Sequence, residues 1–105
     1  MSTAHTPGPW FVPVRTGTQY VEARIGGGWL QEVAACGPTA EAGQQKANAR
    51  LIAAAPDLLE ACVAMIEWDD REQDHAVSFN QRTELCRKAF DKARAAIARA
   101  TGEQS

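Results

Sequence analysis

The sequence predicts an α+β protein, with an N-terminal antiparallel β-meander of about three strands followed by two or three α-helices forming a helical hairpin. Residues 10–36 are rich in aromatic and β-branched residues and are interrupted by glycine and proline. From residue 39 onward, apolar residues recur at helical spacing. Residues 57–74 carry seven acids against one base, and residues 79–100 carry six bases against two acids. Two neighbouring helices with this opposite bias attract each other.

The size and composition indicate one globular domain. The chain has 105 residues, of which 45% are hydrophobic and 23% are charged, and its formal net charge is −2. We expect an extended arm over 1–9, a single α+β domain over 10–101 and a disordered tail over 102–105. The sequence contains no run of eighteen apolar residues of the kind that spans a membrane. Its polar start lacks the pattern of a secretory signal. We therefore expect a cytoplasmic protein that contacts no membrane.

The first half of the chain predicts three strands. Trp10–Val14 is rich in β-formers, and Pro13 confines it to an edge or a strand end. Gly17 marks a turn before a second strand over Gln19–Ile25. The glycines at 26–28 then form a hairpin connection to a third strand over 29–36. Strict alternation assigns one face of the second strand to Tyr20, Glu22 and Arg24. It assigns the other face to Val21, Ala23 and Ile25, so the strand is expected to be half-buried. Leu30 and Val33 are the clearest core candidates of the third strand.

A first helix is expected after the sheet. Thr39 is a suitable N-cap for a start near Ala40, although Gly43 weakens the first turns. The pattern is strongest over Gln44–Ala54, and Pro56 fits as the first residue of a second helix. The buried face of the first helix is expected to contain Ala47, Leu51 and Ala54 or Ala55.

Two further helices are expected to form the hairpin. The acidic run after Trp68 favours a loop, and Ser78 with Gln81 has the spacing of a capping box that opens the third helix. Gly102 fits the position just after that helix. The second helix is expected to bury Leu58, Leu59, Cys62, Met65 and Ile66. The third is expected to bury Cys86, Ala89 or Phe90, Ala93, Ile97 and Ala100.

Catalytic and metal-binding patterns are absent from the sequence. His5 and His75 lie in segments that do not hold a base rigidly, and no nucleophile motif accompanies them. Three widely spaced cysteines (Cys36, Cys62 and Cys86) match neither a disulfide framework nor a zinc site. The acidic run lacks the glycine and the terminal glutamate of a calcium loop. We expect no catalytic residue, no metal and no cofactor.

Several residues remain candidates for binding. The glycine run is best explained as a turn, yet Gly26 and Gly27 beside Arg24 would also let backbone N–H groups approach a phosphate. Large aromatics such as Trp10 are most often core residues, and the alternative is a surface on which a base stacks. Asn48 and Arg50 lie among small residues, where a ligand can approach closely. Arginine suits phosphate and asparagine suits a base edge or a hydroxyl, so function and structure explain this pair about equally well.

Two motifs resemble a known family. The segments His5-Thr6-Pro7-Gly8-Pro9-Trp10 and Ala47-Asn48-Ala49-Arg50-Leu51-Ile52-Ala53-Ala54-Ala55-Pro56-Asp57-Leu58-Leu59, with the closing helix to Gly102, resemble a family of small bacteriophage and prophage proteins. The layout also looks like the first described type of phage Thoeris anti-defence sponge. Members of that family are homo-oligomers that sequester cyclic ADP-ribose isomers or cyclic oligonucleotides without cleaving them. The resemblance implies that Asn48 and Arg50 lie near such a pocket, with Arg24 and the Gly26-Gly27 loop as a second phosphate contact.

The leading hypothesis is therefore a phage-encoded, non-enzymatic protein that sequesters a cyclic nucleotide signal between subunits. The alternative is a phage protein–protein interaction factor that inhibits or redirects a host protein. DNA binding through the basic last helix is the weakest of the three, because acids are interleaved with its bases.

Overall fold

The computed structural model describes residues 4–13 and 19–102. Three antiparallel strands in the order β1-β2-β3 precede three helices, which confirms the α+β class. Val14 and the turn expected at Gly17 lie outside the described residues, as do 1–3 of the expected arm and 103–105 of the expected tail. The elements are β1 (Trp10–Phe11), β2 (Gln19–Ile25), the short turn Gly26–Gly28, β3 (Trp29–Cys36), α1 (Gln44–Ala53), α2 (Ala55–Glu72) and α3 (Phe79–Thr101).

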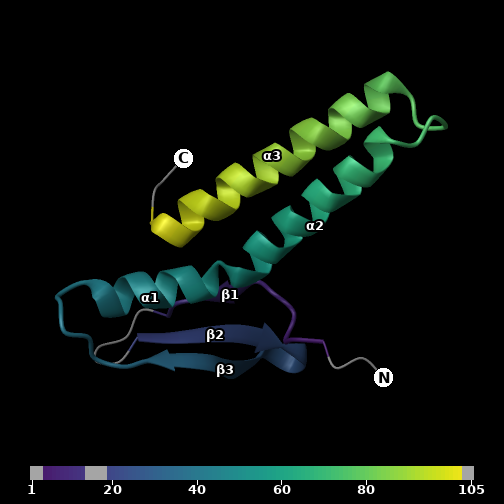
Figure 1. Ribbon diagram of the computed structural model, residues 1–105. Coiled ribbons are helices and arrows are strands. Elements are labelled where there is room, and N and C mark those ends of the chain that lie inside the picture. Colours follow the sequence, from purple (N-terminus) through teal and green to yellow (C-terminus); the bar gives the residue numbers. More distant parts are fainter. Residues whose placement is uncertain (1–3, 14–18, 103–105) are drawn as a thin grey trace.

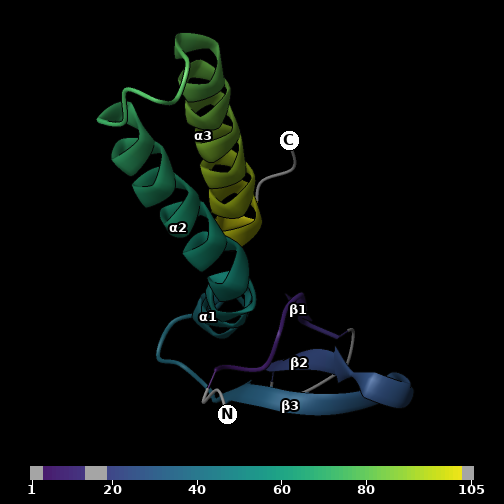
Figure 2. The same ribbon diagram turned by 90° about the vertical axis from the view of Figure 1, so that its right-hand side faces the viewer.

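The helices form two distinct parts. Helix α1 lies over one face of the sheet, and the antiparallel pair α2 and α3 extends away from the sheet (Figure 1). The view from the side shows α1 between the sheet and the hairpin (Figure 2). The expected helical hairpin is therefore present, and α1 joins it to the sheet.

The core between α1 and the sheet is small and rich in alanine. Val21, Cys36, Ala49 and Ala53 are buried together there. Short side chains on α1 let the helix approach the strands closely, which leaves little volume for larger residues. The partly buried residues that pack around this cluster are Trp10, Val12, Val33, Ala34 and Ile52.

The alternation expected for the second strand is only partly correct. Val21 and Ala23 of one expected face are buried, but Glu22 of the opposite face is also buried, in the central strand between Phe11 of β1 and Glu32 of β3. A bulge at this point interrupts the register between β2 and β3, and a bulge changes the direction of the side chains beside it. Ile25 and Leu30 are exposed, because the end of the hairpin extends beyond α1 (Figure 1).

The expected start of α1 is wrong, and of its expected face only Ala54, directly after the helix, is buried. The helix begins at Gln44, because Gly43 adopts a left-handed conformation with φ 88° that no α-helix continues through. Thr39 instead donates its hydroxyl to the Glu41 carbonyl oxygen at 2.8 Å. Leu51 is exposed, and so is Ala47. The buried residues are Ala49, Ala53 and Ala54.

Helix α2 continues through the acidic segment that was expected to be a loop. It ends at Glu72, and Trp68 donates its indole N–H to the Glu72 carboxylate one turn later at 3.0 Å. Arg82 of α3 donates to the Glu72 carbonyl oxygen at 3.3 Å, which satisfies a backbone acceptor at the helix end. Of the acids in this segment, Glu72 also forms an ion pair with Arg82 of the basic helix α3 at 3.7 Å.

The contact between α2 and α3 is made by small residues. Ala61 of α2 and Ala89 and Ala96 of α3 are buried, so the two backbones approach closely. Several larger residues that were expected to be buried are exposed instead. They are Leu59, Cys62 and Ile66 on α2, and Ile97 on α3. Of the alternatives Ala89 and Phe90, Ala89 is the buried one.

The ends of α3 and the pairing of charges agree with the sequence predictions. Ser78 and Gln81 form both hydrogen bonds of the capping box, and Gly102 closes the helix with φ 78°. Ion pairs between α2 and α3 join Glu60 to Lys92 at 2.5 Å and Glu72 to Arg82 at 3.7 Å. Within residues 4–13 and 19–102, no helix is both long and apolar enough to cross a membrane.

Candidate functional site

The two motifs that are far apart in the sequence lie side by side in the structure. The arm before β1 crosses the start of α2, and Gly8 packs directly against Pro56, so that an added Cβ at Gly8 would lie 3.0 Å from the Pro56 Cβ. The arm is held by Trp10, whose indole N–H donates to the Thr6 carbonyl oxygen at 3.0 Å. The ring of His5 meets the Trp10 ring edge-on at 6.1 Å between centroids. The arm is therefore an ordered part of the fold from Thr6 to Trp10.

A surface groove, which we call the arm groove, lies between this arm and α2. One section has a volume of about 550 Å³ and an adjoining section about 230 Å³. The arm contributes His5, Pro7, Gly8, Pro9 and Trp10 to its lining. Helix α2 contributes Ala55, Pro56, Asp57, Leu59, Glu60 and Val63. Proline, leucine and valine side chains give the groove an apolar surface.

Two carboxylates on one side of the groove already have cationic partners. Asp57 accepts from Arg99 at 2.7 Å, and Glu60 accepts from Lys92 at 2.5 Å. A smaller hollow of about 150 Å³ adjoins them, lined by these two carboxylates with Lys92, Ala95 and Ala96. Contacts with α3 thus fix the positions of both acids. The ion pairs reduce the local negative charge, and both carboxylates stay partly accessible to solvent.

The apolar lining of the groove continues along α2 as an exposed stripe. Leu59, Val63 and Ile66 are 50%, 56% and 63% exposed. Their spacing of four and three residues places them on one side of the helix. We call these three residues the α2 stripe. The buried residue Ala61 faces α3, so helix α2 has one apolar face in the hairpin and a second one toward solvent.

Acidic side chains accompany the α2 stripe. Glu67, Asp69 and Asp70 are exposed on the same helix. An apolar strip beside carboxylates suits contact with an apolar segment that also carries bases.

The chemistry of the groove is that of non-covalent binding. Among the described residues, no group of three or more His, Cys, Asp or Glu side chains is arranged to hold a metal ion. The Nδ1 atom of His5 lies 2.9 Å from the Thr6 carbonyl oxygen. The lining therefore offers apolar contact, ring contact and two paired carboxylates. A lowered pKa is found instead on the outer side of α3, where the Arg87 hydrogen bond lowers the pKa of Glu84.

The structure places the expected ligand residues Asn48 and Arg50 away from the arm groove. They are two residues apart on α1, which directs their side chains to different sides of the helix. Asn48 is exposed. The Arg50 guanidinium packs against Gly102 at the end of α3, where an added Cβ would lie 2.5 Å from its Nη1 atom. This position puts a cation beside the carbonyl end of a helix, which is a stabilising arrangement.

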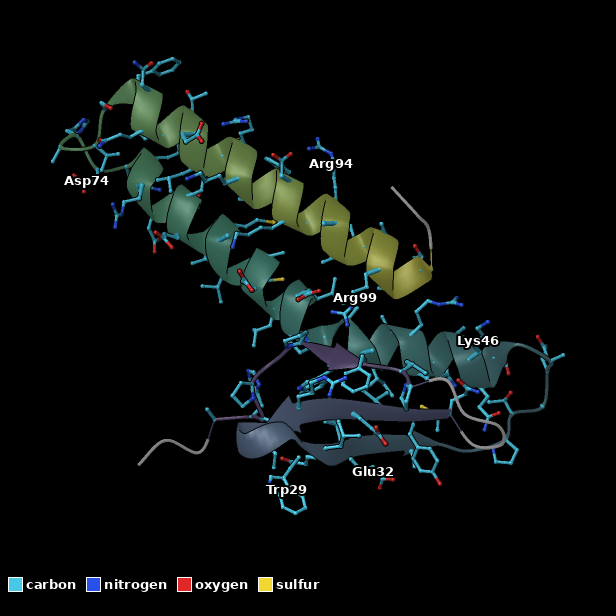
Figure 3. The ribbon with its side chains drawn as sticks, turned by 180° about the vertical axis from the view of Figure 1, so that it is seen from behind. Trp29, Glu32, Lys46, Asp74, Arg94 and Arg99 are labelled. Atoms are coloured by element: carbon cyan, nitrogen blue, oxygen red, sulfur yellow. The ribbon has the colours of Figure 1, made fainter. Side chains whose placement is uncertain are left out.

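The other expected ligand residues lie on the sheet. Trp10 lines the arm groove and packs against the core. Arg24 is exposed with its guanidinium 5.5 Å from the centroid of the Phe11 ring. Gly26 and Gly27 are in the exposed turn beside Trp29, which is 72% exposed and points away from the sheet (Figure 3). Arg24, the turn and Trp29 thus belong to the same hairpin, whereas Asn48 and Arg50 are on a separate element.

The sequence interpretation did not identify Leu59, Val63 and Ile66 as surface residues. It placed Leu59 and Ile66 with Leu58 and Met65 in a single buried stripe, which is too wide for one neighbouring helix to cover. Ala61 was the available signal, because a small residue on a helix marks the place where another backbone comes close.

The chain is similar to a known protein family. Residues 1–104 match the family model described as Salmonella phage P22 protein Y8K6. No curated protein and no solved structure matches the chain.

Proposed function

Because this chain belongs to the phage protein family of Salmonella phage P22 protein Y8K6, we propose that it is a non-enzymatic phage protein that attaches to a host protein through the arm groove and the α2 stripe. It acts by occupying its partner rather than by chemistry. The bound segment carries apolar side chains with bases beside them.

One observation carries this proposal: three aliphatic side chains of α2 are exposed in line with an apolar groove. Leu59, Val63 and Ile66 are each at least half exposed, although α2 already buries a different face against α3. Contiguous apolar surface of this kind on a soluble protein marks an interaction site. Apolar side chains at this spacing are also commonly the surface through which a helix binds a groove of another protein.

The charge around the stripe favours a basic partner. Glu67, Asp69 and Asp70 are exposed on α2, while the ion pairs with α3 involve Asp57, Glu60 and Glu72. Three carboxylates thus remain on the outer part of the hairpin with no cation bound to them among the contacts described. Bases in the partner would speed association and fix its orientation.

The test places a photo-crosslinking amino acid at position 63, with the exposed position 47 of α1, outside the proposed surface, as the matched control. Irradiation in bacterial host cells is expected to link position 63 to one host polypeptide, and position 47 much less. That polypeptide is then purified, and its affinity for the wild-type chain and for Val63→Glu is measured. We expect the substitution to raise Kd at least tenfold. Equal crosslinking at both positions, or equal affinity of both chains, contradicts the proposal.

A second candidate is sequestration of a cyclic nucleotide or a cyclic ADP-ribose isomer, completed by a second subunit. The observation that favours it is the exposed ring of Trp29 directly after the glycine turn, with the exposed Arg24 near the end of the strand that precedes this turn. A base can stack on such a ring while a phosphate meets the guanidinium. Asn48 and Arg50 contribute less to this arrangement, since they lie on α1.

Calorimetry with cyclic ADP-ribose isomers and cyclic di- and trinucleotides tests this second candidate. It predicts binding heat that disappears in Trp29→Ala and persists in Val63→Glu. No heat across the panel contradicts nucleotide binding and leaves the test at position 63 unaffected, so the two functions are separable.

A further inference from the structure

Helix α3 carries its own exposed apolar stripe, distinct from that of α2. Phe79, Phe90 and Ile97 are 71%, 38% and 54% exposed, and Cys86 is half-buried between them in sequence. At 100° per residue, these four residues fall within about 40° of one line along the helix. The buried residues Ala89 and Ala96, which face α2, lie to one side of that line. We call Phe79, Cys86, Phe90 and Ile97 the α3 stripe.

The residues of the α3 stripe are spaced symmetrically, so that the order of intervals is the same when read from either end of the helix. The intervals between its members are seven, four and seven residues. If a second copy of α3 ran antiparallel along this line, Phe79 would lie opposite Ile97 of the second copy. Cys86 would lie opposite Phe90 of the second copy. A surface that complements itself in this way is what a two-fold symmetric interface requires.

The charges beside the stripe have the same symmetry. Arg87 is paired with Glu84 at 2.6 Å, and Arg94 with Asp91 at 3.5 Å. Glu84 is half-buried and the other three residues are exposed. In the antiparallel arrangement, Glu84 comes within about 3 Å along the axis of the level of Arg94 of the second copy. Arg87 comes equally close to the level of Asp91 of the second copy. The two Arg87 side chains flank the symmetry axis, each between a carboxylate of its own chain and one of the other.

From these two symmetries we infer that α3 forms the interface of a homodimer, in which a second copy of the chain packs antiparallel along the α3 stripe. The hairpin extends from the sheet, so most of α3 is free to accept another helix (Figure 1). In the dimer the two sheets lie at opposite ends, and both α2 stripes stay exposed. The inference does not depend on the proposed function.

Disulfide trapping tests the register directly. Phe90→Cys, in a chain whose exposed Cys62 is replaced by serine, puts Cys86 opposite the new cysteine of the second copy. Mild oxidation is expected to give a covalent dimer whose linked peptides join positions 86 and 90. A bond within one helix does not compete, because Cβ atoms four residues apart are about 5–6 Å from each other and a disulfide needs about 4 Å.

Ala95→Cys in the same background is the matched control, since Ala95 is exposed on another side of α3. We expect at least tenfold less covalent dimer from it. Equal yields from both variants, or linkage of position 86 only to itself, would overturn the proposed register.

Sedimentation equilibrium of the unmodified chain provides a second test. The expected mass is twice the 11.3 kDa of one chain. Ile97→Glu, at an exposed position, should return the chain to a monomer with unchanged helical circular dichroism. A wild-type chain that is monomeric at about 100 μM, or an Ile97→Glu chain that stays dimeric, refutes the interface.

Discussion

The Arg99 guanidinium joins three elements, because it donates to Asp57 Oδ2 at 2.7 Å and, through Nη2, to the Trp10 carbonyl oxygen. Arg99 is on α3, Asp57 is in the first turn of α2, and Trp10 is in β1. Figure 3 shows Arg99 directed from α3 toward the sheet. A single side chain thus fixes the hairpin relative to the strand that carries the arm, and with it the shape of the arm groove.

Removing this guanidinium should weaken the fold. Hydrogen bonds to charged groups contribute about 1.5–3 kcal/mol each, and partial exposure reduces this contribution. We therefore expect Arg99→Ala to lower the free energy of unfolding by about 1–2 kcal/mol in urea titrations. The matched control is Arg94→Ala, whose partner Asp91 is exposed, and its change should stay within about 0.5 kcal/mol. Equal losses for both variants contradict the role assigned to Arg99.

The alanine at position 49 should tolerate no larger residue. Ala49 is fully buried between α1 and the sheet. Ala49→Leu is expected to cost about 1–3 kcal/mol of stability through overpacking. Ala47→Leu, on the exposed side of the same helix, should change it by less than about 0.5 kcal/mol. Thermal unfolding of the two variants measures the difference, and a destabilised Ala47→Leu with an unaffected Ala49→Leu would restore the buried face expected from the sequence.

The capping box of α3 should contribute measurably to stability. Ser78→Ala removes the hydrogen bond from the Gln81 N–H to the Ser78 hydroxyl oxygen, and such a loss costs about 1 kcal/mol. Thr39 precedes a turn and caps no helix. Thr39→Ala should therefore cost less than about 0.5 kcal/mol in the same urea titration. A larger loss for Thr39→Ala than for Ser78→Ala would mean that α1, and not α3, has a side-chain cap.

The carboxyl group of Glu84 should titrate below its ordinary pKa of 4.5, because Arg87 donates a hydrogen bond to its charged form. A depressed pKa in the folded chain means that the stabilising effect is present above pH 4.5 and is lost as the pH falls through the lower, folded-state pKa. Carbon-13 NMR of the side chain measures this titration. Arg87→Gln should move the pKa of Glu84 back toward 4.5. A titration of Glu84 that is the same in both chains contradicts the pairing.

The expected first strand over Trp10–Val14 is too long, because β1 ends at Phe11. The bounds of β2 and β3 at their shared turn were predictable because turn residues mark them. The glycines at 26–28 have positive φ at two positions, so the hairpin between β2 and β3 has the bounds that the sequence predicts. The charge bias predicted the hairpin of α2 and α3, and the spacing of Ser78 and Gln81 predicted the start of α3. Turn residues, the capping box and the opposite charge of two segments can all be recognised in a single amino-acid sequence.

Burial was less predictable because it depends on which neighbours are present. Leu51, Leu59 and Ile97 have the composition of core residues, yet alanines occupy the contacts and leave them exposed. The bulge between β2 and β3 has no sequence signature here, and it changed the exposure expected for Glu22. The arm groove combines residues about fifty positions apart, so only the folded chain reveals it.

Calorimetric titration of the crosslinked host protein, once purified, into three chains tests the central claim most directly. The chains are the wild type, Val63→Glu in the α2 stripe and Ile97→Glu in the α3 stripe. Both substitutions are at exposed positions. We expect Val63→Glu to raise Kd at least tenfold and Ile97→Glu to leave the affinity per chain within about twofold, since a tenfold change is about 1.4 kcal/mol. Wild-type affinity in Val63→Glu would contradict binding through α2.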